Sequence, residues 1–237
     1  MRWAQGVLDL VWPRACGVCG GSVGAGGVHI CWDCLASLHT LHPPFCSRCG
    51  DPVDGAITRE YVCSFCVDKP PAFDKARSAA RYRGGLRGLL HRFKYSSAVH
   101  LTVDLAMLLQ SCVSVHYGRE PLDAVAWVPL YPARQRARTY NQSGLLAVAL
   151  ARRLKLPAAR GCLARTRDTE TQTHLSARER AANVRGAFVV RDPEWVEGRR
   201  FLLVDDVMTT GATVNECARA LKEAGAAKVF VVTVARG

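Results

Sequence analysis

The first 70 residues contain cysteines whose spacing suits metal binding. Eight of the 11 cysteines in this sequence form four Cys-x-x-Cys pairs. One pair can offer two thiolates to a tetrahedral metal ion, and two pairs complete a four-thiolate zinc site. The sequence therefore predicts two structural zinc sites. The eight predicted ligands are Cys16, Cys19, Cys31, Cys34, Cys46, Cys49, Cys63 and Cys66.

The glycines beside these pairs indicate which pairs share a metal ion. Gly20 and Gly50 directly follow the first and third pairs, whereas Leu35 and Val67 follow the second and fourth. Glycine at such a position permits the left-handed backbone that turns amides back toward a thiolate. The segment thus repeats with a period of about 30 residues. This favours sequential pairing, with the first four cysteines on one zinc ion and the last four on the other; a cross-braced arrangement remains open.

A second feature with the right chemistry lies near the end of the chain. The apolar run Phe201–Val204 leads to Asp205 and Asp206, and Thr209–Thr213 follows. In open α/β sheets ligands bind at strand ends, and a loop of small residues that opens a helix aims N–H groups at a phosphate. We therefore expect the carboxylates to bind ribose hydroxyls or their Mg²⁺, and the loop to bind a ribose 5-phosphate. The expected binding residues are Asp205, Asp206, Val207, Thr209, Thr210, Gly211, Ala212 and Thr213.

Strands and helices are expected to alternate around these residues. Apolar runs predict strands over residues 76–82, 123–130, 201–205 and 228–234. Helical spacing predicts helices over residues 86–94, 101–113, 141–154 and 214–224, with a turn at Gly84–Gly85 and a helix stop at Gly225. Such alternation with buried-type strands indicates a parallel sheet in an α/β domain. Pro70 and Pro71 mark the boundary between a zinc-ribbon module, residues 1–70, and the α/β domain, residues 71–237.

Charge is distributed unevenly between these two parts. The net charge is +12; residues 1–70 hold five Lys/Arg against six Asp/Glu, and residues 71–237 hold 27 against 14. This asymmetry suggests a polyanionic partner, either a phosphate-rich small molecule or nucleic acid, and a solvated basic surface is the alternative. Residues 71–100 combine seven Lys/Arg with aromatic rings, as grooves that bind single strands do. A role for those rings in the core is the alternative.

The longest apolar runs are too short to cross a membrane. Val229–Val234 has the length of a strand, far below the roughly 20 residues that a spanning helix needs. Asp9 interrupts the apolar stretch at the N-terminus, and no small-residue cleavage site follows it. We expect no membrane span, no secretory signal and a cytoplasmic location.

The stretch 201–213 closely resembles the signature that binds 5-phosphoribosyl 1-diphosphate (PRPP) in type I phosphoribosyltransferases. Residues Val128–Arg134, with Arg138 and Tyr140–Gln142, resemble the strand and diphosphate loop of the ComF family, and residues 165–188 resemble its flexible segment. The four cysteine pairs match the double zinc ribbon of that family. The resemblance covers essentially the whole chain. It implies a type I phosphoribosyltransferase fold behind a small N-terminal zinc-ribbon module.

Phosphoribosyl transfer needs groups that stabilise the leaving diphosphate. We assign this role to Mg²⁺ with Arg134 and Arg138, and Arg165 as a further candidate, because the arginine fork matches phosphate oxygens. A basic surface is the alternative reading of these arginines. The expected catalytic residues are Asp205, Asp206, Arg134 and Arg138.

Two positions depart from the patterns that the resemblance implies. Purine-salvage members of the superfamily carry an Asp at the position of Thr209, near the imidazole ring of the purine, where it can act as a general base. Thr209 cannot act as a general base, so purine salvage is not expected. The family pattern Arg-Gly-Phe-Asn-Gln reads Arg138–Gln142 here, with Thr139 in the place of glycine. We expect this larger side chain to alter the backbone freedom of the loop.

Three classes of function remain open at the level of the sequence. The first is a phosphoribosyltransferase whose acceptor the sequence does not specify. The second, which the resemblance to the ComF family implies, is a competence protein that binds single-stranded DNA and acts with DNA-uptake proteins. The third is a regulator that binds PRPP, or a phosphoribosylated small molecule, without turnover. The intact acidic pair and loop favour PRPP binding in all three.

Overall fold

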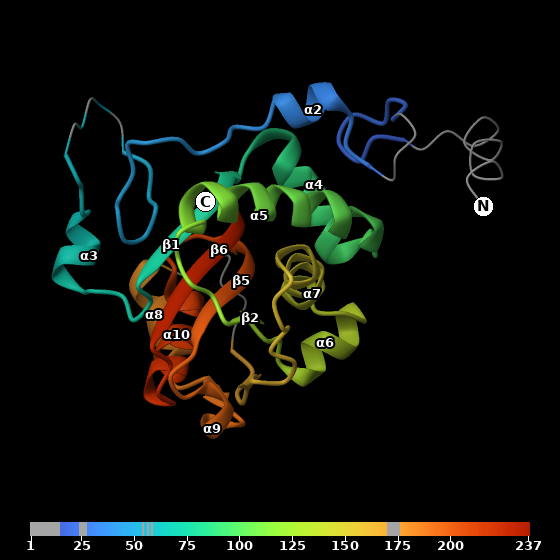
Figure 1. Ribbon diagram of the computed structural model, residues 1–237. Coiled ribbons are helices and arrows are strands. Elements are labelled where there is room, and N and C mark those ends of the chain that lie inside the picture. Colours follow the sequence, from blue (N-terminus) through green and yellow to red (C-terminus); the bar gives the residue numbers. More distant parts are fainter. Residues whose placement is uncertain (1–14, 24–27, 54, 56, 58, 170–175) are drawn as a thin grey trace.

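The computed structural model describes residues 15–23, 28–53, 55, 57, 59–169 and 176–237 (Figure 1). The expected absence of a secretory signal concerns N-terminal residues that lie outside this part of the chain. Residues 170–175, inside the stretch that resembles the ComF flexible segment, also lie outside it.

The centre of the fold is a four-stranded sheet in which all neighbouring strands are parallel. Its order is β1 (Lys75–Arg81), β6 (Lys228–Arg236), β5 (Arg200–Met208) and β2 (Ala124–Trp127). Runs of Val, Leu, Phe and Ala build β5 and β6, and nearly all of these apolar side chains are buried because helices cover both faces of the sheet. The predicted parallel sheet of an α/β domain is confirmed.

Helices lie in two layers around the sheet (Figure 1). One layer is α4 (Gly84–Tyr95), α5 (Thr102–Tyr117) and α7 (Gln142–Leu154), in which α5 packs on β1 and β6 and α7 packs on β5 and β2. The other layer is α10 (Ala212–Glu223) with α8 (Ala177–Val184). The remaining elements are η1 (Val99–Leu101), α6 (Pro132–Arg138), α9 (Pro193–Val196) and an antiparallel pair, β3 (Leu163–Arg165) with β4 (Phe188–Val190).

The start of α4 differs from the expected turn followed by a helix. Gly84 has a left-handed backbone, with φ +55°, yet it is the first residue of the helix. A Cβ at Gly85 would collide with the side chain of Val18 in the N-terminal module. Gly85 therefore lets the first turn of α4 approach that module closely, and the two glycines belong to the helix and not to a separate turn.

The acidic pair also lies elsewhere than expected on its strand. We expected the strand to end at Asp205, but β5 continues to Met208, paired in register with Arg236 of β6. Carboxylates do not interrupt a strand when its parallel neighbour keeps supplying backbone partners. The two aspartates therefore lie inside β5, close to its carboxyl end, and the loop begins at Thr209.

The N-terminal module pairs with the edge strand β1. The N–H of Arg81 donates to the carbonyl of His39 (2.8 Å), and the N–H of Leu41 donates to that of Ala79 (3.2 Å). Further along, the N–H of Ala76 donates to a carbonyl of the same module, that of Arg48 (2.7 Å). An uncovered edge strand invites pairing with other chains. Here the module occupies that edge along most of its length.

The two halves of this module join different parts of the core. Cys16 and Ile30 pack with buried residues of α4 and α5, on one face of the sheet. Cys46 and Cys66 pack with buried residues of α10, on the other face. The module thus shares both cores with the sheet, and the boundary at residue 70 stays a prediction.

One helix among the described residues, Val99–Tyr117, is long and apolar enough to cross a membrane by length and composition alone. It comprises η1 and α5. Its inward side chains, among them Leu105, Leu109 and Tyr117, are buried against the sheet. This is the packing of a core helix, so the length and composition of this helix are only weak evidence for a membrane span.

Candidate functional site

The cysteines gather into two groups that match sequential pairing. The sulfur atoms of each group lie within 4.8 Å of one another. The first group is Cys16, Cys19, Cys31 and Cys34, and the second is Cys46, Cys49, Cys63 and Cys66. The cross-braced alternative is therefore excluded. The positive φ angles of Gly20 (+76°) and Gly50 (+69°) agree with the predicted turns.

Backbone N–H groups prepare one sulfur of each group for metal binding. Burial alone would raise the pKa of Cys16, but N–H groups, among them those of Cys31 and Val18 (3.2 and 3.3 Å), lower it to about 6. The same balance lowers the pKa of Cys46 to about 7. Zinc binds the thiolate form of cysteine, and four thiolates close a structural site. The donor sets fit two zinc ions.

The acidic pair is surrounded by groups that hold its charge. The Ser143 hydroxyl, from the first turn of α7, donates to Oδ1 of Asp205 (2.7 Å). Lys94 Nζ, from the last turn of α4, lies 2.9 Å from Oδ2 of Asp206. Burial and the neighbouring charge of Asp206 raise the pKa of Asp205 to about 7. The two carboxylates therefore need positive charge nearby, and Lys94 supplies one.

This arrangement is compatible with Mg²⁺ as well. The ion prefers oxygen ligands, and carboxylates that share a site with a substrate phosphate are its usual protein ligands. Asp205, Asp206 and the Ser143 hydroxyl offer such oxygens. The raised pKa of Asp205 is the mark of an acidic site that a cation would stabilise.

The loop from β5 to α10 depends on one glycine. Gly211 has a φ of +78° and is the residue from which α10 begins. A Cβ there would lie 2.7 Å from the flexible methyl end of Met208, and residues with a side chain rarely adopt such a φ, so a substitution would strain the loop. The N–H of Ala212 donates to the Thr210 hydroxyl (3.4 Å), and Arg180 of α8 donates to the Thr209 hydroxyl (3.1 Å).

A second support reaches this loop from the zinc module. Arg236, at the end of β6, is 8% exposed and donates from Nη1 to the carbonyl of Thr209. Its Nε and Nη2 donate to Oδ1 of Asp51 (3.1 and 2.9 Å). Asp51 comes two residues after the zinc ligand Cys49. A chain of contacts therefore joins the second zinc site to the predicted phosphate loop.

Of the three arginines assigned to the diphosphate, Arg134 and Arg165 lie together at Thr169, and Arg138 lies apart from them at Tyr95. Arg134 of α6 lies 3.0 Å from the Asp168 carboxylate and donates to the carbonyl of Thr169. Arg165 is 9% exposed and donates to the Thr169 hydroxyl; burial and the charge of Arg134 lower its pKa, and its Nε has no hydrogen-bond partner among the described residues. Arg138 instead donates to the Tyr95 hydroxyl (3.1 Å) and stacks over that ring.

The backbone at Thr139 explains why glycine suits that position. Its φ is +66°, in the left-handed region where a β-branched residue is an outlier. The residue caps the C-terminus of α6, and the N–H of Thr139 donates to the carbonyl of Arg136 (3.3 Å). The loop keeps the conformation that glycine would adopt, at a cost of about 1–2 kcal/mol.

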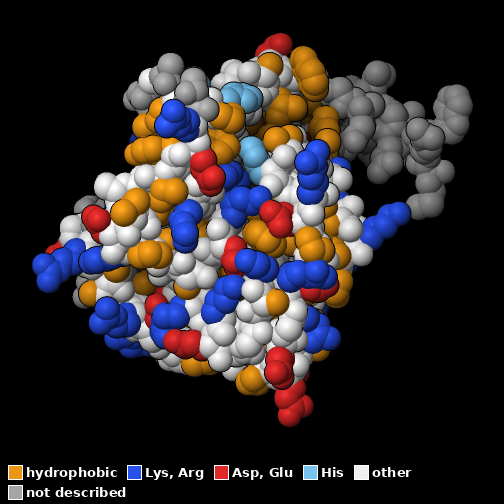
Figure 2. Space-filling model, turned by 60° about the vertical axis from the view of Figure 1, so that its left-hand side comes forward, with side chains coloured by type: hydrophobic (Ala, Val, Ile, Leu, Met, Phe, Trp, Pro, Cys, Tyr) orange, Lys and Arg blue, Asp and Glu red, His pale blue; other side chains and the backbone are white. Residues whose placement is uncertain are grey.

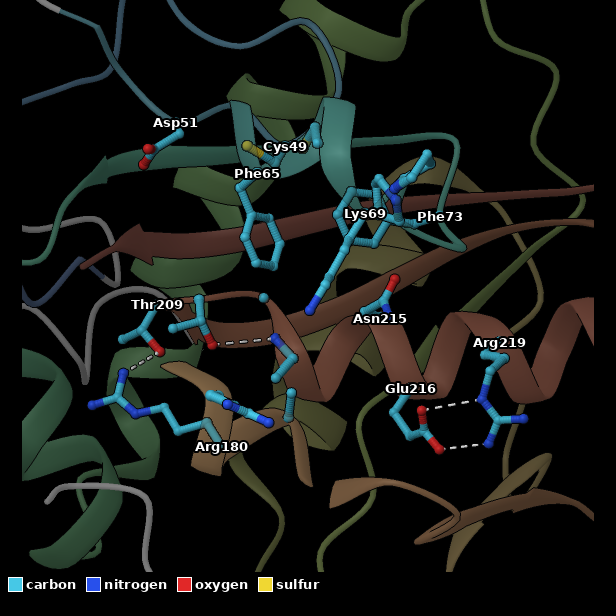
Figure 3. Close-up of a pocket in the computed structure, with 18 of the residues that line it drawn as sticks. Cys49, Asp51, Phe65, Lys69, Phe73, Arg180, Thr209, Asn215, Glu216 and Arg219 are labelled. Atoms are coloured by element: carbon cyan, nitrogen blue, oxygen red, sulfur yellow. Dashed lines mark hydrogen bonds and ion pairs between the residues drawn. The ribbon is translucent and has the colours of Figure 1, made fainter. Parts of the chain in front are cut away.

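The predicted phosphate loop opens into a cleft of about 1520 Å³ (Figure 3). Its walls are α3 (Ser64–Asp68) of the second zinc site, the loop, α8 and the first turns of α10. Figure 2 shows the side of the molecule that bears α3, α8 and α10, where many basic side chains are spread between fewer acidic ones. Thr209, Thr210, Gly211 and Ala212 line the cleft, whereas Asp205, Asp206, Arg134 and Arg138 do not.

Comparison with known proteins adds two family matches and close relatives. Residues 7–68 match the double zinc ribbon domain, and residues 141–237 match the phosphoribosyl transferase domain. The chain is 35% identical over 229 residues to the DNA utilization protein YhgH of Escherichia coli (strain K12), covering 94% of this chain and 97% of that protein. It is 34% identical over 222 residues to Competence protein F of Haemophilus influenzae, covering 89% and 94%.

A solved structure gives a weaker match. The glutamine PRPP amidotransferase from B. subtilis, complexed with ADP and GMP, has 23% identity and a TM-score of 0.40. The match covers 60% of this chain and 30% of that chain, so this chain spans less than a third of that protein.

Proposed function

Because this chain belongs to the ComF family of competence and DNA-utilization proteins, we propose that it binds PRPP, or another ribose 5-phosphate ligand, with Mg²⁺ and serves DNA uptake or use. One observation carries this proposal. Within the matched phosphoribosyl transferase domain, an acidic pair, with Asp205 half-buried and Asp206 buried, is followed by a glycine-turned loop that opens α10. A loop of this kind aims N–H groups and the positive helix end at a phosphate.

Each residue then has a chemical role. The N–H groups of Thr210–Thr213 hold the 5-phosphate, and Asp205 and Asp206 hold the ribose hydroxyls. Ser143 orients Asp205 through its hydrogen bond. Mg²⁺, when bound, supplies charge to the diphosphate. Lys94, which lies 2.9 Å from Asp206, gives up that contact when the cation and ligand arrive.

We propose phosphoribosyl transfer as the reaction. The bond between the anomeric carbon and a diphosphate oxygen breaks, and its electron pair leaves with the diphosphate. Arg134 and Arg165, which both contact Thr169, stabilise that leaving charge. The acceptor supplies the new electron pair, and Thr209 offers it no base. A reducing compartment such as the cytoplasm suits eight zinc thiolates.

Binding without turnover is the second candidate, and the position of Arg138 favours it. This arginine was expected at the diphosphate, but it lies on Tyr95. Release of diphosphate from PRPP in the presence of nucleophiles separates the two candidates. Turnover predicts diphosphate production, and a PRPP-responsive regulator predicts binding alone.

Calorimetry with PRPP and Mg²⁺ tests the proposed binding. Wild-type protein should bind in a Mg²⁺-dependent way, and Gly211→Val should lose at least about tenfold in affinity because a β-branched residue strains the left-handed backbone of the loop. The double change Asp205→Asn with Asp206→Asn should abolish the Mg²⁺ dependence. Gly161→Val is the matched control, because Gly161 has a similar φ (+72°) away from the loop. No PRPP affinity in folded wild-type protein with Mg²⁺ would refute the proposal.

A further inference from the structure

We propose that the cleft beside the loop binds the 5′-phosphorylated end of a single DNA strand, with the terminal phosphate on the loop. The inference rests on the proposed function, since it uses the same loop. The terminal nucleotide of such a strand is itself a pentose 5′-phosphate. The group that the loop is proposed to hold in PRPP is therefore also present at the end of a strand.

The size of the cleft exceeds what a small ligand needs. Pockets for small molecules usually measure about 300–1000 Å³, and this cleft measures about 1520 Å³. The loop forms one part of its wall, between α3 and α8. A phosphate on the loop therefore leaves room for the nucleoside that carries it and for the residues that follow.

The charge of the cleft suits a polyanion. Six cationic side chains line it against two carboxylates. Both carboxylates are neutralised within the cleft, Asp51 by Arg236 (2.9 Å) and Glu216 by Arg219 (3.1 Å). A four-thiolate zinc site behind α3 adds about two negative charges, so a positive excess remains. The lining cations are Lys69, Arg178, Arg180, Arg185, Arg219 and Arg236.

Lys69 is placed to meet a phosphate of the strand. Figure 3 shows its side chain extending from the end of α3 toward the loop, on the opposite side of the cleft from Arg180. In the described part of the chain its ammonium group makes no hydrogen bond or ion pair. Lys69 and Arg180 therefore bracket the loop, and the charge of Lys69 is available to a second phosphate group.

An aromatic ring faces the loop across the same cleft. Phe65 is 54% exposed, and its ring points from α3 toward Thr209 (Figure 3). It lies between the zinc ligands Cys63 and Cys66, so metal binding holds in place the backbone from which the ring extends. Exposed rings beside cations are the usual stacking surface for unpaired bases. Phe65 is thus placed to stack on the base of a terminal nucleotide.

Fluorescence anisotropy with two short oligothymidylates tests this inference. Both carry a 3′ label, and they differ only in a 5′-phosphate or a 5′-hydroxyl. We expect the phosphorylated strand to bind wild-type protein about tenfold more tightly, because charge-assisted hydrogen bonds to the loop are lost with the phosphate. Gly211→Val should remove this preference, and Thr210→Val is a second variant if the first fails to fold.

The zinc-site residues are tested in the same assay. Phe65→Ala should weaken binding of both strands about five- to tenfold through loss of stacking. Val67→Ala is the matched control, because Val67 is also exposed on α3 but does not line the cleft. Lys69→Ala should weaken binding and reduce its salt dependence by about one counterion. PRPP with Mg²⁺ should displace the phosphorylated strand.

The outcomes separate this inference from the proposed function. Equal affinity for the two strands, or a preference that survives both loop variants, overturns the inference. If PRPP binds in calorimetry and the strands are not distinguished, the proposed function stands and the inference falls. If the protein distinguishes the two strands and PRPP does not bind, the inference stands and the proposed PRPP binding falls.

Discussion

At the scale of single residues, the acidic pair shows most clearly how the fold prepares a site. Asp205 and Asp206 are neighbours on a mostly buried strand, and each is held by a side chain from a different helix, Ser143 and Lys94. Two adjacent carboxylates repel, and burial adds to that cost. The raised pKa of Asp205, about 7, is the result. In the free protein the ionised form of Asp205 is therefore destabilised, and a ligand that arrives with its cation would stabilise that charge.

This cost predicts that Asp205→Asn stabilises the free protein. The pKa of Asp205 in the folded state lies above its ordinary 3.8, so its contribution to stability is fully present below about pH 4 and is lost as the pH rises through 7. The variant has no such loss. Its free energy of unfolding should exceed that of the wild type by about 1–3 kcal/mol at pH 8 in Mg²⁺-free buffer.

Thermal unfolding from pH 4 to pH 8, without a chelator that would remove zinc, measures this difference. Asp123→Asn is the control with the opposite sign, because Arg200 lowers the pKa of Asp123 to about 2. That variant should be less stable than wild type at neutral pH. An Asp205→Asn protein that is less stable than wild type at pH 8 would show that the carboxylate is not destabilising.

Residue types revealed the metal ligands and the loop, but not the groups that support them. Cysteine pairs and the Asp-Asp-loop sequence have local signatures. Lys94, Ser143 and Arg236 have none, because each acts on a residue that only the fold brings near. Ser143 is 62 residues from Asp205 in sequence, and Asp51 is 185 from Arg236. Arg138 donates to Tyr95 of α4 in the free protein, and its assignment to the diphosphate stays a prediction.

At the scale of elements, the second zinc-binding segment and the loop after β5 form one unit. The link runs from Asp51 through Arg236 to the carbonyl of Thr209. Arg236 is buried, so its guanidinium is held in place and transmits the position of Asp51 to the loop. Loss of the second zinc ion should therefore loosen a loop to which no cysteine belongs.

Cys63→Ser tests that link. The variant should lose one of two zinc ions, and the amides of residues 209–213 should exchange hydrogen faster than in wild type. Cys31→Ser should also lose one zinc ion but leave those amides slow, because among the residues that the structure describes no such contact joins the first site to the loop. Zinc is measured by elemental analysis and exchange by mass spectrometry.

Asp51→Asn separates the link from metal loss. It should keep both zinc ions and still speed exchange of residues 209–213, since a charge-assisted hydrogen bond becomes a neutral one. Asp33→Asn makes the same change on α2 (Trp32–Ala36) of the first site and serves as control. Unchanged exchange in the Asp51 variant would mean that the loop is held without the zinc module.

The sequence predicted where most long elements lie but not where they end. Apolar runs located β2, β5 and β6, and helical spacing located α5, α7 and α10. The ends moved because pairing and packing partners decide them, as β6 does for the last residues of β5. The three-residue strands β3 and β4 are too short to carry a periodic pattern, so they were missed.

At the scale of the whole molecule, the zinc module is a structural part of the domain that it precedes. It covers the edge strand β1 and supplies buried cysteines to both faces of the sheet. It also forms the wall of the cleft that faces the loop. The cysteine-rich segment, which its composition sets apart from the rest of the chain, therefore packs against the α/β domain, and the two together line the cleft beside the loop.

The central claim is that the loop after β5 binds a ribose 5-phosphate, and a crystal structure with PRPP and Mg²⁺ tests it most directly. We expect the 5-phosphate to lie against the amides of Thr210–Thr213 and Lys94 to have left Asp206. Electron density for PRPP elsewhere on the protein, or an empty loop at a concentration that calorimetry shows to be saturating, would contradict the claim.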